Sequence, residues 1–235
     1  CSITKKANIE SLGKIRQLHK QFPSSRIIIT GCAKTDNIKN LKNVHFLNNR
    51  QKDLLTRRQK SAYTPKIDDK FSHTNRYLLK IQSGCNFFCS YCIVPYRRPG
   101  PWSLPIKTAI NATDLAVKNN YHEIIITGTN LELYRPGLAN LIRQLLQETS
   151  IPLISFGSIP LNCLNDDLID LFSNPKYQTR LDRFLHIPLQ SGSTKILKLM
   201  NRRYHRQKII KVFSKLKASN SRLQFGTDII VGFPG

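Results

Sequence analysis

The sequence predicts an α/β protein, in which a small amino-terminal α/β domain precedes a series of parallel strands separated by helices. Short apolar runs, such as Ile27–Ile29 and Ile124–Ile126, have the length and composition of buried strands. Later in the chain, such runs alternate with segments in which apolar residues recur every three or four positions, as in helices that cover a sheet. This alternation predicts a parallel sheet, either open or curled into a barrel, with its chemistry at the carboxyl ends of the strands.

The first domain is expected over residues 1–52. Its predicted elements are a helix at Thr4–Phe22, a strand at Arg26–Thr30, a short helix at Asp36–Leu41 and a strand at Val44–Leu47. Residues 53–75 are rich in charged and polar side chains and show no sustained period, so we interpret them as a linker.

The second domain is expected over residues 76–235. The predicted strands are Tyr77–Gln82, Glu123–Gly128, Pro152–Phe156, Phe184–Leu189 and Gln224–Gly232. The predicted helices are Thr108–Asn120, Gly137–Thr149, Asp166–Ser173 and Arg206–Ser219. Residue 1 is Cys, and Gly235 follows a strand with no covering helix, so we interpret the sequence as a piece of a longer protein.

The 235 residues carry a net charge of +23, from 37 Lys and Arg against 14 Asp and Glu. The excess lies in residues 1–60 and 181–235, around a slightly acidic middle. Such a field attracts a polyanion, so we expect tRNA or rRNA to bind these two ends, with Arg202, Arg203 and Arg206 contributing. The alternative is a solvated basic surface without a partner. No apolar run approaches the roughly 18 residues that span a bilayer, and no secretory leader is evident, so we expect a cytoplasmic protein without a membrane partner.

Three of the six cysteines, Cys85, Cys89 and Cys92, lie within eight residues of one another. An odd number of cysteines in one short loop is a poor basis for disulfides. Structural zinc normally takes four protein ligands, and no fourth Cys or His follows at the usual spacing. Three thiolates suit a 4Fe–4S cluster, whose fourth iron stays open to bind a substrate or cofactor. The loop follows the first predicted strand of the second domain, where a cofactor site is expected.

The Cys-x-x-x-Cys-x-x-Cys spacing, with an aromatic residue before the third Cys, resembles the signature of radical S-adenosylmethionine (radical SAM) enzymes. Further stretches are similar, in order, to the methylthiotransferase branch of that superfamily: CSITKKA with TGCAKTD, YLLKIQSGCNFFCSYCIVPYRRPG, HIPLQSGSTKILKLMNRRY and GTDIIVGFPG. The resemblance covers essentially the whole chain. It implies that the second domain is a partial (β/α) radical SAM barrel.

The resemblance also implies roles for individual residues. Cys85, Cys89 and Cys92 would hold a 4Fe–4S cluster, which binds S-adenosylmethionine and, when reduced, cleaves it to a 5'-deoxyadenosyl radical. The implied cofactor-binding residues are Tyr91 beside the adenine, Gly128, Thr129 and Asn130 at the methionyl group, and Gln190, Ser191, Ile230 and Gly232 nearby. Structural interpretations stay open at three places: a tight turn at Gly128, a core side chain at Tyr91 and a buried strand at Ile229–Gly232.

In the family that the chain resembles, the amino-terminal domain carries a second, auxiliary 4Fe–4S cluster on three cysteines. Cys1 and Cys32 match two of these ligands, and the third would precede residue 1. Cys163 matches no family ligand, so we interpret it as a structural thiol.

The segments SFGSIP, MNRRY and GTDIIVGFPG favour the branch that adds a methylthio group to carbon 2 of threonylcarbamoyl-adenosine next to the tRNA anticodon. The resemblance also admits the isopentenyl-adenosine branch, the ribosomal-protein branch, and a degenerate, non-catalytic basic RNA-binding protein with an iron–sulfur or zinc site. Pro160 departs from the family pattern, which has Glu there. The expected partners are a tRNA and an electron donor for the cluster, and we expect a monomer.

Overall fold

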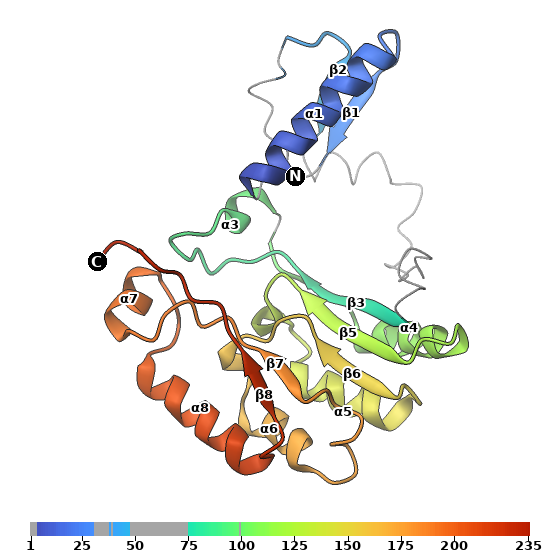
Figure 1. Cartoon of the computed structure of the whole chain (residues 1–235). Helices are drawn as coiled ribbons and strands as arrows, with labels where there is room; N and C mark the ends of the chain where they lie inside the picture. Colours follow the sequence, from blue (N-terminus) through green and yellow to red (C-terminus); the bar gives the residue numbers. More distant parts are fainter. Residues whose placement is uncertain (1–3, 31–37, 39, 48–74, 99) are drawn as a thin grey trace. The chain divides into compact units, whose positions relative to one another are not determined.

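The structure is a computed structural model that describes residues 4–30, 38, 40–47, 75–98 and 100–235. The chain divides into two compact units, residues 1–62 with 92–100 and residues 63–91 with 101–235. Figure 1 labels their helices and strands. The expected linker at 53–75 lies almost entirely outside the described residues, so the predicted domain boundaries stay a prediction.

The first unit contains helix α1 (Lys5–Gln21), the parallel strands β1 (Ile27–Thr30) and β2 (Val44–Leu47), and the single helical turn α3 (Val94–Arg97). The hydroxyl of Thr4 begins α1 by accepting a hydrogen bond from the amide of Ala7 over 3.2 Å. The apolar stripe of α1 packs onto β1 in a small core of Leu12, Ile15, Ile29 and Ile38. The predicted helix and two strands are confirmed, whereas the short helix expected at Asp36–Leu41 lies largely outside the described residues.

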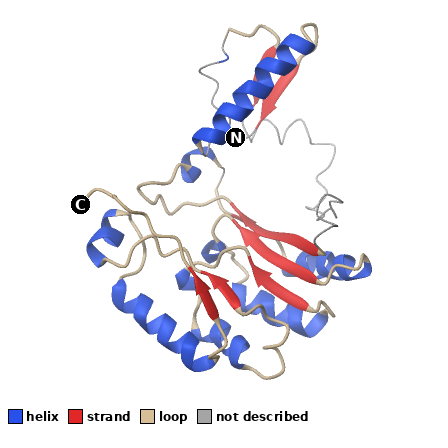
Figure 2. Cartoon of the chain, in the orientation of Figure 1, coloured by secondary structure: helices blue, strands red, loops and turns tan. Residues whose placement is uncertain are grey.

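The second unit contains strands β3 (Arg76–Ser83), β4 (Trp102–Ser103), β5 (Glu123–Gly128), β6 (Leu153–Phe156), β7 (Phe184–His186) and β8 (Gln224–Gly226). The first four form a sheet in the order β4-β3-β5-β6, with β3, β5 and β6 parallel and β4 antiparallel at the edge. Strands β7 and β8 form a parallel pair. A bridge between Ile154 and Leu181, and a 2.9 Å hydrogen bond from the amide of Ile159 to the carbonyl of His186, connect β6 to β7. The strands therefore form a curved, partial barrel (Figure 2).

The helices of this unit are α4 (Ile106–Lys118), α5 (Leu138–Glu148), α6 (Asp166–Ser173), α7 (Thr194–Leu199) and α8 (Arg206–Ser219), with the 3-10 turns η3 (Leu131–Leu133) and η4 (Leu161–Cys163). Figure 1 shows α4, α5, α6 and α8 on the same side of the strands. Leu141 and Leu145 of α5 and Ile124 and Ile126 of β5 are completely buried in one core. Burial of one such side chain stabilises the fold by about 1.5–3 kcal/mol, so the helix layer holds the strands in place.

The predicted ends of the last two strands are wrong. Strand β7 ends at His186, three residues earlier than expected, because Pro188 has no amide hydrogen with which to continue the ladder. Strand β8 ends at Gly226, six residues earlier than expected. Beyond it, Ile229 forms only an isolated bridge with Gln190, whose φ of 68° turns the chain away from strand geometry.

The other predicted helices and strands of this unit agree with the structure to within two residues at each end. The elements β4, α3 and α7 were not predicted, because two to six residues are too few to show a period. Among the helices that the structure describes, none combines the length and apolar character needed to cross a bilayer.

Candidate functional site

The clustered cysteines lie on a loop that follows the carboxyl end of β3. Cys85 and Cys89 belong to the second unit, and Cys92 begins the segment that belongs to the first; all three thiols are free and half-buried. The loop turns through Gly84 (φ 79°) and Phe88 (φ 51°), both in the left-handed region. In the described part of the chain, no three His, Cys, Asp or Glu side chains are grouped closely enough to hold a metal ion. N–H donors from other parts of the chain lie beside two of the three sulfurs, those of Cys85 and Cys89.

The sulfur of Cys85 lies beside the residues that follow β5. Nδ2 of Asn130 donates to this sulfur over 3.6 Å, and the backbone amide of Asn130 donates to Oε1 of Gln82 over 2.8 Å. Gln82 is completely buried, and its Nε2 donates to the carbonyl oxygens of Ser83 (3.0 Å) and Gly84 (2.7 Å). This one side chain therefore couples the end of β5 to the start of the cysteine loop. The sequence analysis missed it, although an amide residue at the end of an apolar strand was a usable signal.

Gly128 has a packing reason to be glycine. A Cβ at this position would lie 2.8 Å from Cδ2 of Leu131 and 3.0 Å from the Cβ of Gln82. Carbon atoms that are not bonded prefer separations of about 3.5–4.0 Å, so a side chain here would force β5 away from β3. The missing side chain thus lets β5 approach Gln82 and brings Asn130 to Cys85. This packing requirement does not exclude the role in cofactor binding that the resemblance implies for Gly128.

The sulfur of Cys89 lies beside a charged residue from a distant part of the chain. Nη1 of Arg202 is 3.8 Å from the sulfur, while Nη2 donates to the carbonyl of Pro188 (3.0 Å) and to the hydroxyl of Tyr204 (2.7 Å). Burial of the guanidinium opposes its charge, but Tyr204 and Cys89 beside it outweigh this effect and raise the pKa of Arg202. A cationic N–H donor therefore faces the thiol.

Residues next to Arg202 hold the cysteine loop at its middle. Nδ2 of Asn201 donates to the carbonyl oxygens of Phe87 and Phe88, each over 3.1 Å. The guanidinium of Arg203 lies 3.6 Å from the centre of the Phe87 ring. These contacts hold the loop at Phe87 and at Phe88, the residue whose φ is 51°. The sequence analysis used the MNRRY segment only to choose a branch and missed this positioning role.

The other predicted cofactor-binding residues follow β7 and β8. The amide of Ile230 donates to the carbonyl of Gln190 over 2.9 Å, and the buried hydroxyl of Ser191 accepts a backbone amide over 3.1 Å. Gly232 has a φ of 73° and open space where a Cβ would be. Ile229 is 52% exposed, so the interpretation of this segment as a buried strand is wrong. These residues therefore belong to the loops that follow β7 and β8, and the hydrogen bond between Ile230 and Gln190 joins the two loops.

Four further positions were singled out in the sequence, one tyrosine and three cysteines. Tyr91 is 40% exposed, which contradicts its interpretation as a core side chain. Burial, assisted by the charge of Glu132, raises the pKa of the Cys163 thiol to about 12, as expected of a structural cysteine. Cys1 and Cys32 lie outside the described residues.

A row of polar side chains crosses the carboxyl ends of three successive strands, and the sequence analysis missed it. Oγ of Ser158, after β6, is 2.8 Å from Nδ1 of His186, at the end of β7. Nε2 of His186 is 3.4 Å from Oδ2 of Asp228, after β8. We call these residues the polar row. Of these residues only Ser158 follows a predicted strand, because His186 and Asp228 lie inside predicted strands that the structure ends earlier, at His186 and Gly226.

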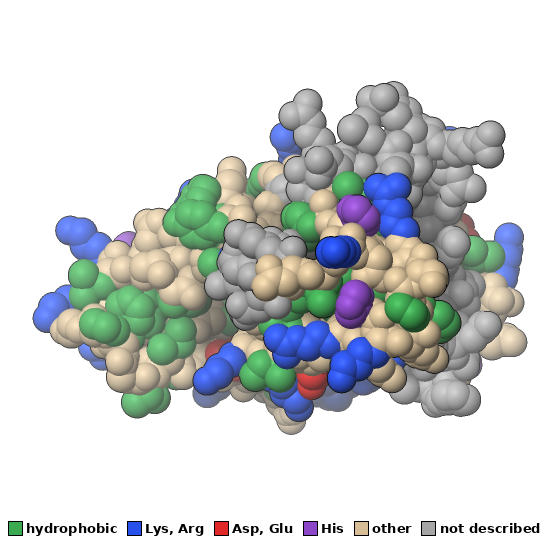
Figure 3. All heavy atoms as spheres, turned by 90° about the horizontal axis from the view of Figure 1, so that it is seen from above, with side chains coloured by type: hydrophobic (Ala, Val, Ile, Leu, Met, Phe, Trp, Pro, Cys, Tyr) green, Lys and Arg blue, Asp and Glu red, His purple; other side chains and the backbone are tan. Residues whose placement is uncertain are grey.

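The basic character of the sequence is visible on the surface. The face shown in Figure 3 carries more Lys and Arg side chains than Asp and Glu side chains. Arg203 and Arg206 are exposed, as expected of residues that contact phosphates, but Arg202 is half-buried beside Cys89 and is not a free surface charge. The contribution of the three arginines to RNA binding stays a prediction, and the contacts of Arg202 with Cys89 and Tyr204 distinguish it from the other two.

The sequence profile of the radical SAM superfamily matches residues 79–235. The threonylcarbamoyladenosine tRNA methylthiotransferase MtaB of Chlamydia pneumoniae is 34% identical over 249 residues, covering 100% of this chain and 58% of that protein. The tRNA-2-methylthio-N(6)-dimethylallyladenosine synthase of Thermodesulfovibrio yellowstonii is 29% identical over 258 residues, covering 100% of this chain and 59% of that protein. This chain therefore spans about three fifths of the length of the curated relatives it matches.

Solved structures are similar in fold. The apo form of the cobalamin-dependent S-adenosylmethionine radical enzyme OxsB has a TM-score of 0.64 at 12% identity, covering 96% of this chain and 39% of that chain. The radical S-adenosylmethionine methyltransferase TsrM from Kitasatospora setae has a TM-score of 0.58 at 12% identity, covering 75% of this chain and 35% of that chain. At these identities the likeness shows the fold alone, and it confirms the predicted partial barrel.

Proposed function

This chain belongs to the radical SAM superfamily, and we propose that it acts in the methylthiolation of tRNA, at the threonylcarbamoyl-adenosine next to the anticodon. The proposed reaction adds a methylthio group to carbon 2 of that adenosine. The observation that carries the proposal is the cysteine loop after β3, where Asn130 and Arg202 donate N–H groups to the sulfurs of Cys85 and Cys89. Such donors favour negatively charged sulfur, which is the form that binds iron.

We assign a 4Fe–4S cluster to Cys85, Cys89 and Cys92. The donor set fits this group, because three half-buried thiols stand on one loop and two of them receive N–H donors. When bound and reduced, the cluster supplies the electron that cleaves the sulfonium of S-adenosylmethionine. The chain's own contribution is positional: Gln82 fixes the start of the loop and Asn201 fixes its middle.

We assign S-adenosylmethionine to the adjoining ends of the strands. In this proposal Gly128, Thr129 and Asn130 contact the methionyl group, and the half-exposed ring of Tyr91 lies beside the adenine. The remaining proposed contacts are Gln190, Ser191, Ile230 and Gly232. The buried amide of Gln82 supports this assignment, since its hydrogen bond to the Asn130 backbone keeps the end of β5 in one conformation.

We also propose a second, auxiliary 4Fe–4S cluster in the amino-terminal domain, with Cys1 and Cys32 as two of its ligands. A third ligand of the family pattern would precede residue 1. Methylthiolation needs a sulfur source as well as a radical, and a cluster held by these cysteines would supply the site for sulfur transfer.

The polar row supports threonylcarbamoyl-adenosine over isopentenyl-adenosine as the substrate. Threonylcarbamoyl carries amide, hydroxyl and carboxylate groups, whereas isopentenyl is a hydrocarbon. The hydroxyl of Ser158, the imidazole of His186 and the carboxylate of Asp228 can exchange hydrogen bonds with such polar groups, and a hydrocarbon offers them none. Isopentenyl-adenosine stays the second candidate, because a synthase of that kind is 29% identical along this whole chain.

The proposed partners are a tRNA and a low-potential electron donor, and the proposed state is a cytoplasmic monomer. The net charge of +23 supports a polyanionic partner. Charge alone contacts phosphates and does not choose a base, so the choice of adenosine is assigned to the ends of the strands.

Formation of 5'-deoxyadenosine in the presence of different tRNAs tests the proposal. The chain is reconstituted without oxygen and reduced, and S-adenosylmethionine is added with tRNA that carries threonylcarbamoyl-adenosine, isopentenyl-adenosine or unmodified adenosine. We expect deoxyadenosine formation to be stimulated by the first tRNA only, because a bound substrate completes the site. Stimulation by the second tRNA alone supports the second candidate. Iron-loaded protein that forms no deoxyadenosine with any tRNA contradicts both.

A further inference from the structure

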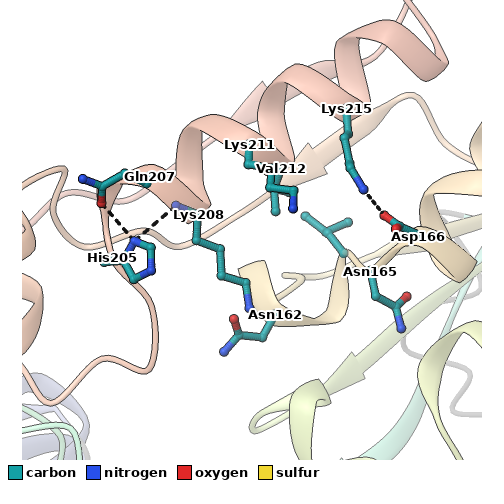
Figure 4. A pocket seen from close by; sticks show the side chains of 10 residues that line it. Asn162, Asn165, Asp166, His205, Gln207, Lys208, Lys211, Val212 and Lys215 are labelled. Atoms are coloured by element: carbon teal, nitrogen blue, oxygen red, sulfur yellow. Dashed lines mark hydrogen bonds and ion pairs between the residues drawn. The ribbon is translucent and has the colours of Figure 1, made fainter.

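A groove lies on the outer helix layer, between α8 and the segment that leads from η4 into α6. Its volume is about 470 Å³, and its walls combine the apolar side chains of Leu164 and Val212 with many polar ones. Three lysines of α8 line it: Lys208, Lys211 and Lys215. Figure 4 shows Lys208 reaching toward Asn162, and Lys215 toward Asp166, across the groove. The groove is separate from the cysteine loop and has no role in the proposed chemistry.

The charge in this groove is uneven along its length. Nζ of Lys215 is 2.5 Å from Oδ1 of Asp166, and this contact lowers the pKa of that carboxyl, so both members of the pair are charged. Among the described residues, no carboxylate lies within ion-pair distance of Lys208 or Lys211. The amino-terminal end of α8 adds partial positive charge on the same side. Asp166 is therefore paired with Lys215 and also interacts electrostatically with Lys211, whereas in the described part of the chain Lys208 and Lys211 form no ion pair of their own.

The position of the two remaining lysines favours a phosphate backbone over a small anion. Lys208 and Lys211 are about one helical turn apart, roughly 4.5 Å along α8 at about 1.5 Å per residue, so they lie on the same face of the helix. A small phosphate would also need backbone amides that converge on it. The amide of Leu168 donates to the side chain of Asn165, and that of Lys208 donates to the side chain of His205, so neither is available.

We propose that this groove binds the phosphate backbone of an RNA through Lys208 and Lys211. The inference rests on the proposed function in one respect, because a tRNA substrate is what makes RNA the expected occupant. It adds the location of the contact, on the helix layer and away from the base that reacts. It also states which end of the groove is used. The RNA backbone binds at the end that contains Lys208, because the ion pair with Asp166 occupies Lys215 at the other end.

Four forms of the full chain test the groove: wild type, the double variant Lys208→Gln with Lys211→Gln, the control Lys217→Gln, and Asp166→Asn. Lys217 is an exposed residue of the same helix that does not line the groove. Binding of a tRNA transcript is measured by fluorescence anisotropy across a range of salt concentrations. A second readout is acylation of individual lysines, measured by mass spectrometry with and without the tRNA, with inorganic phosphate as a competitor.

We expect the double variant to bind at least tenfold more weakly, with a salt dependence that is flatter by about one for each lysine lost. The control should bind as the wild type does. Asp166→Asn should bind more tightly, because it releases Lys215 as a third cation. In the acylation experiment, tRNA should protect Lys208 and Lys211 but not Lys217.

Equal binding by the double variant and the wild type overturns the groove assignment and leaves the proposed function intact. No binding of tRNA by the wild type overturns the assignment as well. Protection of Lys208 and Lys211 by inorganic phosphate but not by tRNA makes the groove a small-anion site, which also contradicts the proposal. If tRNA binds in the groove but no tRNA stimulates deoxyadenosine formation, the assignment of the groove to RNA is supported and the proposed function is contradicted.

Discussion

Nη1 of Arg202 lies 3.8 Å from the sulfur of Cys89, although 113 positions separate the two residues in the sequence. The same guanidinium is anchored by the carbonyl of Pro188 and the hydroxyl of Tyr204, so its direction toward the sulfur is fixed by two other contacts. A charged N–H donor beside a thiolate stabilises added negative charge on that sulfur. Arg202 is therefore a positioning and tuning residue in the proposed site.

Arg202→Met should make the proposed cluster harder to reduce. Without the cationic donor, the reduced and more negative state loses stabilisation. We expect the midpoint potential to fall by about 30–60 mV, a roughly threefold to tenfold change in the ratio of oxidised to reduced cluster at about 59 mV per tenfold. The measurement is a redox titration followed by electron paramagnetic resonance. Arg202→Lys should recover part of the shift, and Arg206→Met, at an exposed arginine, should leave the potential unchanged.

Cys89→Ala should abolish the iron–sulfur absorbance of residues 76–235, because it leaves one iron of the proposed cluster without a protein ligand. Cys163→Ala is the matched control, since that thiol is buried and plays no part in the proposed cluster. Iron content and visible absorbance after anaerobic reconstitution give the answer. Equal loss in both variants, or loss in neither, would show that the ligand assignment is wrong.

Cys163 should react slowly with iodoacetamide in the folded, metal-free chain. Burial raises its pKa to about 12 from a usual value of about 9, so at pH 8 its thiolate fraction falls roughly a thousandfold. The folded state favours the neutral thiol, so ionisation of this residue has no effect on stability at neutral pH. It lowers stability as the pH rises above the thiol's unfolded value. Mass spectrometry of the alkylated peptide should show much faster reaction in urea, and equal rates would contradict burial of this thiol.

Gly128→Ala should destabilise the chain and weaken its binding of S-adenosylmethionine. The added Cβ would stand 2.8 Å from Leu131 and 3.0 Å from Gln82, and overpacking of this kind costs about 1–3 kcal/mol. The displaced backbone would also move Asn130. Gly157→Ala is the control, because its nearest neighbour, Oγ1 of Thr127, would be 3.6 Å from the new Cβ. Thermal unfolding and calorimetric titration should separate the two variants.

The chain by itself should carry out only the first half of the proposed reaction. Cys85, Cys89 and Cys92, with Asn130 and its neighbours, provide the proposed site for cleavage of S-adenosylmethionine. The proposed sulfur transfer also needs the proposed auxiliary cluster, and this sequence contains two of the three ligands expected for it. We therefore expect some 5'-deoxyadenosine and no methylthio-adenosine in tRNA, both measured by mass spectrometry. Formation of methylthiolated tRNA by this chain would contradict the expectation that Cys1 and Cys32 alone do not suffice for sulfur transfer.

Much of this protein could be predicted from the sequence because the relevant signals are local. Helical spacing located α5, α6 and α8, and short apolar runs located β3 and β5, each to within two residues. The cysteine spacing identified the superfamily without any knowledge of contacts. Local patterns failed at the ends of β7 and β8, where the length of a strand depends on which neighbour can pair with it.

By itself the sequence determined the α/β class, the cysteine loop and the basic ends, since each depends on residues close together in the chain. Only the tertiary structure decided which distant residues serve that loop. The sequence analysis grouped Arg202 with Arg203 and Arg206 as RNA-binding residues, yet it lies beside Cys89, while Lys208 and Lys211 line an open groove. The ends of parallel strands converge on one edge only after the barrel has curved, so contacts between them are absent from any local pattern of the sequence.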